Sequence, residues 1–164
     1  MSRADRAPRQ RSRQIALQAL YAHDLAVAEC ETSGAQRTPI DETFERVAQN
    51  FDLPGGARDF ALELARGTAA DRAAIDALLA ANALNWKLSR MAAVDRNVLR
   101  LATYELMRTD TPVSVVLDEA IQLAKRFGSE ASPSFVNGVL DAVARELRGY
   151  AAGQDRRESN GGHA

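Results

Sequence analysis

Apolar residues recur every three or four positions along most of the chain, and stretches that alternate with a period of two are scarce. That spacing places the apolar side chains on one face of an α-helix. Alanine, the strongest helix former, is abundant throughout. We therefore predict an all-α protein of about six helices. They are expected over residues 8–29, 38–51, 57–81, 89–108, 112–128 and 132–149.

Proline and glycine punctuate this pattern at the expected helix ends. Pro39, Pro112 and Pro133 suit first-turn positions, where the missing N–H has no helical partner. Gly128 is expected to end the helix before it, and Gly67 is the weakest point of the 57–81 helix. The short connections favour antiparallel neighbours packed as a bundle.

The composition is that of an ordinary globular domain. The chain has 164 residues, enough to bury a core without disulfides or metals. A lone Cys30 excludes a disulfide framework and a cysteine-based zinc site, so we expect no cofactor and no metal. The chain has no apolar run near the roughly 20 residues that a membrane span needs. A cytoplasmic, reducing location is expected.

The net charge of -1 conceals an uneven distribution. Residues 1–13 carry five arginines and one aspartate, a net of +4, which leaves -5 for the rest of the chain. A basic arm therefore precedes an acidic body. Such asymmetry points to a nucleic-acid or membrane partner, although arginine-rich ends are also common as solvated tails.

The chain offers little material for catalysis. His23 and His163 are its only imidazoles, and no nucleophile elbow, phosphate-binding glycine loop, dinucleotide turn or zinc-protease pair is present. The carboxylates lie at ordinary helix-surface spacings. We therefore expect that the protein is not an enzyme.

Two stretches stand out as specific strings rather than compositions. The first is RSRQIALQALYAHDL at residues 11–25, and the second contains LDEAIQLAKRFG and FVNGVLDAVA near the end of the chain. Together they closely resemble the NusB family of transcription antitermination factors, over roughly residues 9–148. The middle third matches mainly in its helical pattern.

The resemblance implies a compact NusB-like fold of two packed small helix bundles without catalytic activity. We expect this domain at residues 9–149, between a flexible basic arm at residues 1–8 and a disordered tail at residues 150–164. It implies binding to the single-stranded boxA element of ribosomal RNA leader transcripts together with NusE, a ribosomal small-subunit protein. That complex joins elongating RNA polymerase and suppresses premature termination. Some relatives form homodimers, and the sequence leaves open whether this chain is a monomer or a homodimer.

A polar stripe on the first helix fits this function. Arg11, Gln14, Gln18 and Tyr21 follow one another by three, four and three positions, so they share a helix face. Arginines neutralise phosphates, and an aromatic ring stacks on an unpaired base. For Tyr21, a half-buried core position is an equally good interpretation.

The resemblance adds further candidates residue by residue. Arg9, Arg11 and Arg13 match the family's arginine-rich segment, in which Gln10 departs from a basic position. Phe135 matches an aromatic offered to RNA, although its spacing to the next apolar residues suits a core anchor equally. Asp95 matches an acidic position near the surface that binds RNA and NusE, and is predicted to be partner-binding. Gly138 is expected to serve close helix packing.

Two other classes of function remain. Related helical modules precede the catalytic domain of some ribosomal RNA cytosine methyltransferases, as RNA-binding accessory modules. No cofactor-binding α/β domain accompanies the helices here, so we expect a free-standing factor. The other alternative is a helical protein-interaction module whose basic arm is only a soluble tail.

Overall fold

The computed structural model describes the backbone of residues 3–160 and the side chains of residues 6–148. Within that range the chain is helical and contains no β-strand. A short 3-10 turn, η1, precedes the fifth helix. The helices are α1 (Arg3–Ser33), α2 (Ile40–Ala48), α3 (Ala57–Ala70), α4 (Arg72–Asn82), η1 (Leu88–Arg90), α5 (Ala93–Arg108), α6 (Val113–Phe127) and α7 (Ser132–Asn160).

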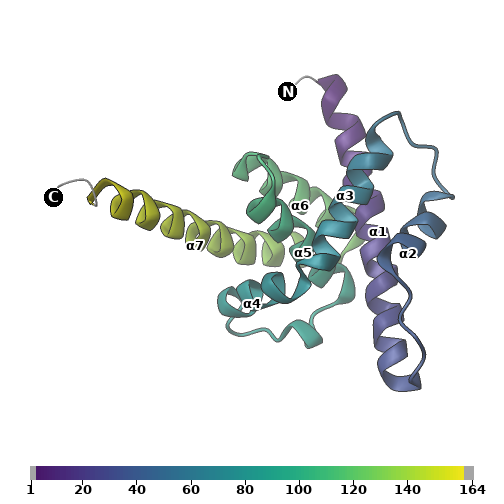
Figure 1. The fold of residues 1–164 in the computed structure, drawn as a ribbon. Helices are drawn as coiled ribbons and strands as arrows, with labels where there is room; N and C mark the ends of the chain where they lie inside the picture. The colour runs from purple at the N-terminus through teal and green to yellow at the C-terminus, as the bar shows by residue number, and fades with distance from the viewer. Residues whose placement is uncertain (1–2, 161–164) are drawn as a thin grey trace.

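The helices form two small bundles, as predicted. α1, α2 and α3 pack against one another on one side of the molecule, and α4, α5, α6 and α7 pack together on the other (Figure 1). α1 and α3 also contact α5, which joins the two bundles. The all-α fold of two packed bundles is confirmed.

Each bundle has its own buried cluster, and α1 contributes to both. Ile15 and Ala19 face the smaller cluster with Phe44 of α2, whereas Leu17 and Leu20 face the larger one. The two sets lie on different sides of α1 because residues two positions apart point about 200° apart on a helix. α1 therefore packs against both buried clusters, one on each side of the helix.

The third predicted helix divides in two, at a different point from the expected weak one. The structure breaks the 57–81 helix at Asp71, between α3 and α4, and Gly67 lies inside α3. Gly67 packs directly against the ring of Tyr104 from α5, where an added Cβ would lie 2.1 Å from Tyr104 Cζ. The glycine thus permits a close helix contact rather than a break.

Both ends of the fold are more helical than the sequence predicts. α1 begins at Arg3, so most of the arm predicted at residues 1–8 is helical, and Pro8 lies inside the helix. α7 continues to Asn160 rather than ending at Gly149, into the tail predicted at residues 150–164. Alanine and arginine favour helix in both stretches, and no proline follows Pro133. Residues 161–164 lie outside the described residues.

Candidate RNA interface

The stripe predicted on α1 is present on one face of the helix. Arg11 donates a hydrogen bond from Nη1 to Gln14 Oε1 at 3.4 Å, and its guanidinium lies 5.3 Å from the centre of the Phe51 ring. Gln18 is half-buried, and Tyr21 is 38% exposed. Tyr21 therefore combines a packed side with a solvent-facing side, which suits both interpretations drawn from the sequence.

Beside Tyr21 the surface is hollowed and apolar. This hollow measures about 350 Å³. Its walls come from α1, α2, the first turn of α5 and the end of α6, through Leu17, Gln18, Tyr21, Val47, Val94 and Phe127. A flat apolar group such as a nucleobase suits walls of this kind, because aromatic and aliphatic side chains stack on any base.

A second, more polar hollow follows one turn earlier along α1. It measures about 220 Å³ and lies between α1 and α6, with Gln14 on one side and Arg126 on the other. Gln10 donates a hydrogen bond from Nε2 to Glu119 Oε1 at 3.3 Å across its floor. The two hollows lie one turn apart along α1, with amide and guanidinium groups at the second and mainly apolar groups at the first.

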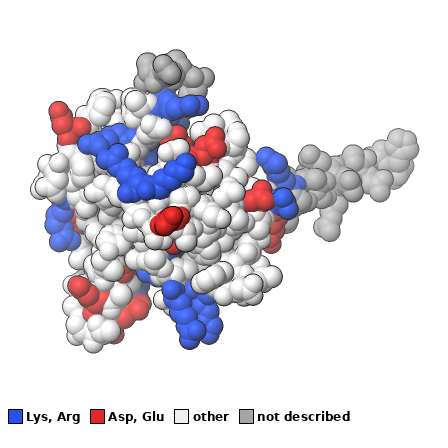
Figure 2. All heavy atoms as spheres, turned by 180° about the vertical axis from the view of Figure 1, so that it is seen from behind, with Lys and Arg blue, Asp and Glu red and all other residues white. Residues whose placement is uncertain are grey.

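Figure 2 shows the charges on the face opposite to the view of Figure 1. Lys and Arg side chains gather in a band across the upper part of that face, with isolated carboxylates beside them. Lys125 and Arg126, in the last turn of α6, are both exposed. A band of basic groups gives the electrostatic attraction that nucleic-acid backbones require.

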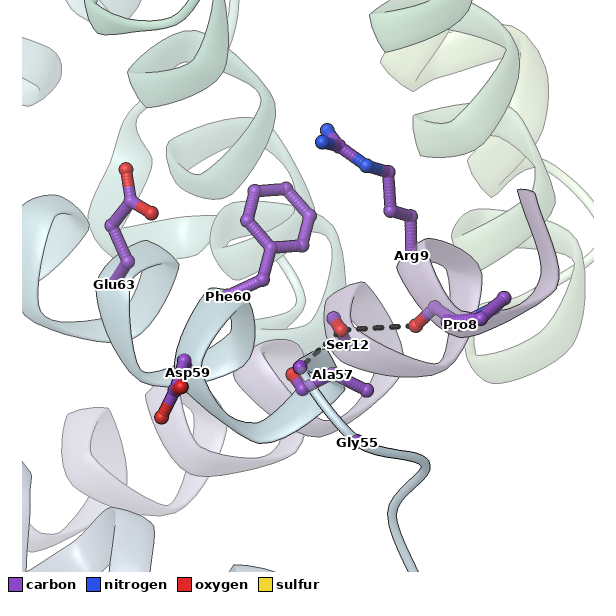
Figure 3. Close-up of a pocket in the computed structure, with 9 residues that line it drawn as sticks. Pro8, Arg9, Ser12, Gly55, Ala57, Asp59, Phe60 and Glu63 are labelled. Atoms are coloured by element: carbon purple, nitrogen blue, oxygen red, sulfur yellow. Dashed lines mark hydrogen bonds between the residues drawn. The ribbon is translucent and has the colours of Figure 1, made fainter. Parts of the chain in front are cut away.

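Arg9 points to a different side of α1 from Arg11. Its guanidinium lies 4.8 Å from the centre of the Phe60 ring of α3 and stays exposed (Figure 3). Ser12, on the same side, donates from Oγ to the carbonyl oxygens of Pro8 and Ala57 at 2.9 and 2.7 Å. A rotation of about 200° separates two helical positions that are two residues apart. The three predicted arginines therefore do not form one continuous row.

The structure corrects the prediction for Arg13. Its side chain is only 3% exposed and forms a bidentate ion pair with Glu105 of α5, Nε–Oε1 at 2.7 Å and Nη2–Oε2 at 2.8 Å. Burial opposes the charge, but the hydrogen bonds and charges of Glu105 and the charge of Glu119 outweigh it and raise the pKa of Arg13. Its donors are engaged inside the protein, so Arg13 ties the bundles together and is not accessible to RNA.

Asp95 lies in the first turn of α5, next to Val94 of the apolar hollow. A carboxylate is favourable at this position because the helix N-terminus carries partial positive charge. Its Oδ1 atom is buried and has no hydrogen-bond partner among the described residues. Asp95 therefore combines a buried, unpaired Oδ1 atom with a half-buried side chain, one residue away from the wall of the hollow that contains Tyr21.

A buried cluster around Asp24 fixes this corner of the molecule. Asp24 accepts hydrogen bonds from Arg96 Nη2 at 2.8 Å and Asn97 Nδ2 at 3.0 Å, and lies 3.3 Å from Arg100 Nη1. Arg96 also donates to the carbonyl oxygens of Leu88 and Met91, both at 3.1 Å. The cluster thereby connects α1 to η1 and to the start of α5, and holds the first turn of α5 in place.

Asp24 remains charged in this setting. Burial alone would raise its pKa, but the hydrogen bonds from Arg96 and Asn97, with the charges of Arg96 and Arg100, hold the pKa of Asp24 below its ordinary value. A buried carboxylate is tolerated when it is paired and hydrogen-bonded in this way.

Phe135 is half-buried at the start of α7 and packs against a residue that the sequence analysis did not single out. The rings of Phe135 and Trp86 are 5.6 Å apart at 70°, an edge-to-face contact. Trp86 is 60% exposed. A sequence signal was available, because the only tryptophan of the chain lies in a stretch where the helical pattern fades.

Gly138 does not serve the close packing expected of it. It is exposed on α7, and an added Cβ would meet no atom within 4 Å. No group of three or more potential metal ligands occurs in the part of the chain that the structure describes. None of the described helices is long and apolar enough to cross a membrane.

Comparison with known proteins identifies the class to which this helical fold belongs. The sequence model of the NusB family matches residues 10–145. The chain is 49% identical over 140 residues to the transcription antitermination protein NusB of Anaeromyxobacter dehalogenans (strain 2CP-1), covering 85% of this chain and 92% of the relative. The corresponding protein of Desulfotalea psychrophila is 43% identical over 133 residues, covering 80% of this chain and 92% of that relative.

Solved structures agree with the sequence comparison. A structure of T. maritima NusB is similar to this chain, with a TM-score of 0.72 and 37% identity, covering 84% of this chain and 91% of that one. A crystal structure of the antitermination factors NusB and NusE in complex with dsRNA is similar with a TM-score of 0.69 and 26% identity. The match covers 85% of this chain and 98% of that chain. The chain belongs to the NusB family. This membership confirms the prediction of a transcription antitermination factor rather than an enzyme.

Proposed function

We propose that this chain binds the boxA element of nascent ribosomal RNA leader transcripts together with NusE, and that the complex joins RNA polymerase in the cytoplasm to suppress termination. The observation that carries this proposal is the surface along α1. Arg11, Gln14, Gln18 and Tyr21 lead along one helix face to an apolar hollow of about 350 Å³. The similar NusB structure with NusE and dsRNA supports the choice of partners.

In this proposal the RNA contacts are divided by chemistry. Arg9 and Arg11 neutralise phosphates, Gln18 donates or accepts hydrogen bonds at base edges, and Tyr21 and Phe135 stack on unpaired bases. Asp95, beside the hollow, accepts hydrogen bonds from a basic or polar group of the protein partner. Arg13 supports α1 from inside the fold.

The test is the binding of a labelled boxA-like single-stranded RNA, with and without NusE, against a scrambled RNA at two salt concentrations. We expect tighter and sequence-selective binding when NusE is present. Tyr21→Ala should weaken binding roughly tenfold, since stacking on one ring contributes about 1–3 kcal/mol. Binding that ignores RNA sequence and NusE would contradict the proposal.

The protein-interaction alternative makes the opposite prediction. If the basic segment is only a solvated tail, a double Arg9→Ala, Arg11→Ala variant keeps its RNA affinity and its salt dependence. In our proposal the double variant binds more weakly, and the slope of affinity against salt falls by about two.

The oligomeric state can be tested in the same samples by sedimentation. We propose that any homodimer of the free protein covers the α1 surface and competes with RNA. Such a dimer should dissociate when boxA RNA is added. A dimer that persists in the RNA complex would place its interface elsewhere.

A further inference from the structure

The loop between α4 and α5 carries an exposed apolar surface that the proposed site does not use. Leu84 is 85% exposed and Trp86 is 60% exposed. The other large, exposed apolar side chains in the described part of the chain are Tyr21 and Leu25, both on α1. Tryptophan is usually well buried, so an exposed one indicates a binding role.

Trp86 is held in a defined position although it is exposed. Its backbone N–H donates to the carbonyl oxygen of the buried Ala83 at 3.0 Å. Its ring packs edge-to-face against Phe135 at 5.6 Å. η1 then fixes the following turn, where Arg90 N–H donates to Lys87 O at 2.9 Å. A ring that is positioned in advance loses little conformational freedom when a ligand stacks on it.

The charged side chains that line the hollow at Trp86 are of one sign. The loop encloses an open hollow of about 710 Å³, and the charged side chains among the described residues that line it are Lys87 and Arg90. Both are exposed. An aromatic ring flanked by two cations is the arrangement that binds single-stranded nucleic acid, because the cations hold phosphates while a base stacks on the ring.

The loop also adjoins the proposed RNA site. Phe135 contacts Trp86 directly and is itself a proposed stacking residue. One turn further along α7, Gly138 leaves open space, with no atom within 4 Å of an added Cβ. RNA that stacks on Phe135 therefore lies next to the indole of Trp86.

We propose that Trp86 is an additional base-stacking residue, and that Lys87 and Arg90 bind the phosphates next to the stacked base. This inference rests on the proposed function, because it extends the same RNA beyond Phe135. The other occupant, a protein docking on Leu84 and Trp86, would need carboxylates beside its apolar contact in order to pair with the two cations. RNA uses both the ring and the cations.

The experiment uses Trp86 itself as the probe, since the chain has no other tryptophan. The full chain is titrated separately with unlabelled boxA-like RNA and with NusE while tryptophan fluorescence is recorded. A base stacked on the indole quenches its emission, so we expect quenching by RNA alone. In parallel, RNA affinity is measured with labelled RNA for wild type and variants.

Trp86→Ala should weaken RNA binding roughly tenfold, and Trp86→Phe should retain most of the affinity because it keeps a stacking face. A double Lys87→Ala, Arg90→Ala variant should lower the slope of affinity against salt by about two. Leu84→Ala is the matched control, since it removes an exposed apolar group of the same loop and should leave RNA affinity unchanged. Circular dichroism verifies that each variant folds.

Two results would overturn the inference alone: equal RNA affinities of wild type and Trp86→Ala, or a Trp86→Ala defect confined to NusE binding. The second result would assign the loop to the protein partner. Absence of RNA binding by the wild-type chain, with and without NusE, would instead remove the proposed function together with this extension.

Discussion

The arginines of α1 differ in burial and in their partners according to the helix face on which they lie. Arg11 lies on the surface beside Gln14 and Phe51, whereas Arg13 is enclosed against Glu105. The sequence shows the same residue type at both positions, and only the identity of the facing helix separates them. The number of arginines in residues 1–13 is therefore larger than the number that RNA can contact, because Arg13 is buried.

Alanine substitutions should separate these two roles. Arg13→Ala should lower the free energy of unfolding by roughly 3–5 kcal/mol, because it leaves Glu105 buried without its partner. Arg11→Ala should change that free energy by about 0.5 kcal/mol or less and weaken RNA binding instead. Denaturant unfolding and RNA titration measure the two effects. Equal loss of stability in both variants would refute the distinction.

The lowered pKa of Asp24 makes a prediction about pH. A carboxyl whose pKa is lower in the folded state stabilises the fold above its ordinary value, about pH 4, and loses that contribution as the pH falls toward the folded value. Asp24→Asn should therefore cost roughly 3 kcal/mol of unfolding free energy at pH 7. The difference from wild type should shrink below pH 4. If the difference in unfolding free energy between wild type and Asp24→Asn is constant from pH 7 to pH 3, the charge of Asp24 does not contribute to stability.

At the scale of elements, the pattern of apolar positions predicts nearly every helix, because each helix buries one face. It does not locate the break at Asp71, since alanine-rich segments on both sides continue the same periodicity. In the sequence Gly67 suggests a weak point of the helix. In the structure a glycine is needed there because the Tyr104 ring of α5, 37 positions later in the chain, packs against it. Contacts between helices of this kind leave no local signal.

Gly67→Ala and Gly138→Ala form a matched pair of helical substitutions. Gly67→Ala should destabilise the fold by about 1–3 kcal/mol, because the new methyl group collides with the Tyr104 ring. Gly138→Ala should stabilise it by about 0.4–1 kcal/mol, because open space surrounds the position and alanine restricts the unfolded chain. Thermal and denaturant unfolding measure both. A stabilising Gly67→Ala would mean that Tyr104 moves aside at little cost.

For the whole molecule, the division of α1 between two buried clusters makes the bundles interdependent. The Arg13–Glu105 pair, the Gln10–Glu119 hydrogen bond and the Asp24 cluster all connect α1 to the second bundle. The resemblance of the sequence to a family predicts the two bundles, but it does not predict these connections. The partners are far apart in the chain, and side-chain chemistry alone does not pair them.

We expect unfolding in a single cooperative transition. Trp86 reports on the second bundle, and far-ultraviolet circular dichroism reports on all helices together. The two signals should coincide in a denaturant titration. A loss of ellipticity that precedes the fluorescence change would show that the α1–α3 bundle unfolds on its own.

The Arg13–Glu105 pair also bears on how the protein is made. It joins residues 92 positions apart, and α1 leaves the ribosome long before α5 exists. During synthesis Arg13 therefore lacks its carboxylate, and the side of α1 with Leu17 and Leu20 has no second bundle to cover it. Contacts between distant parts of a chain form slowly, and exposed apolar faces are bound by chaperones in the meantime. α1 therefore completes its buried contacts only after α5 has been synthesised.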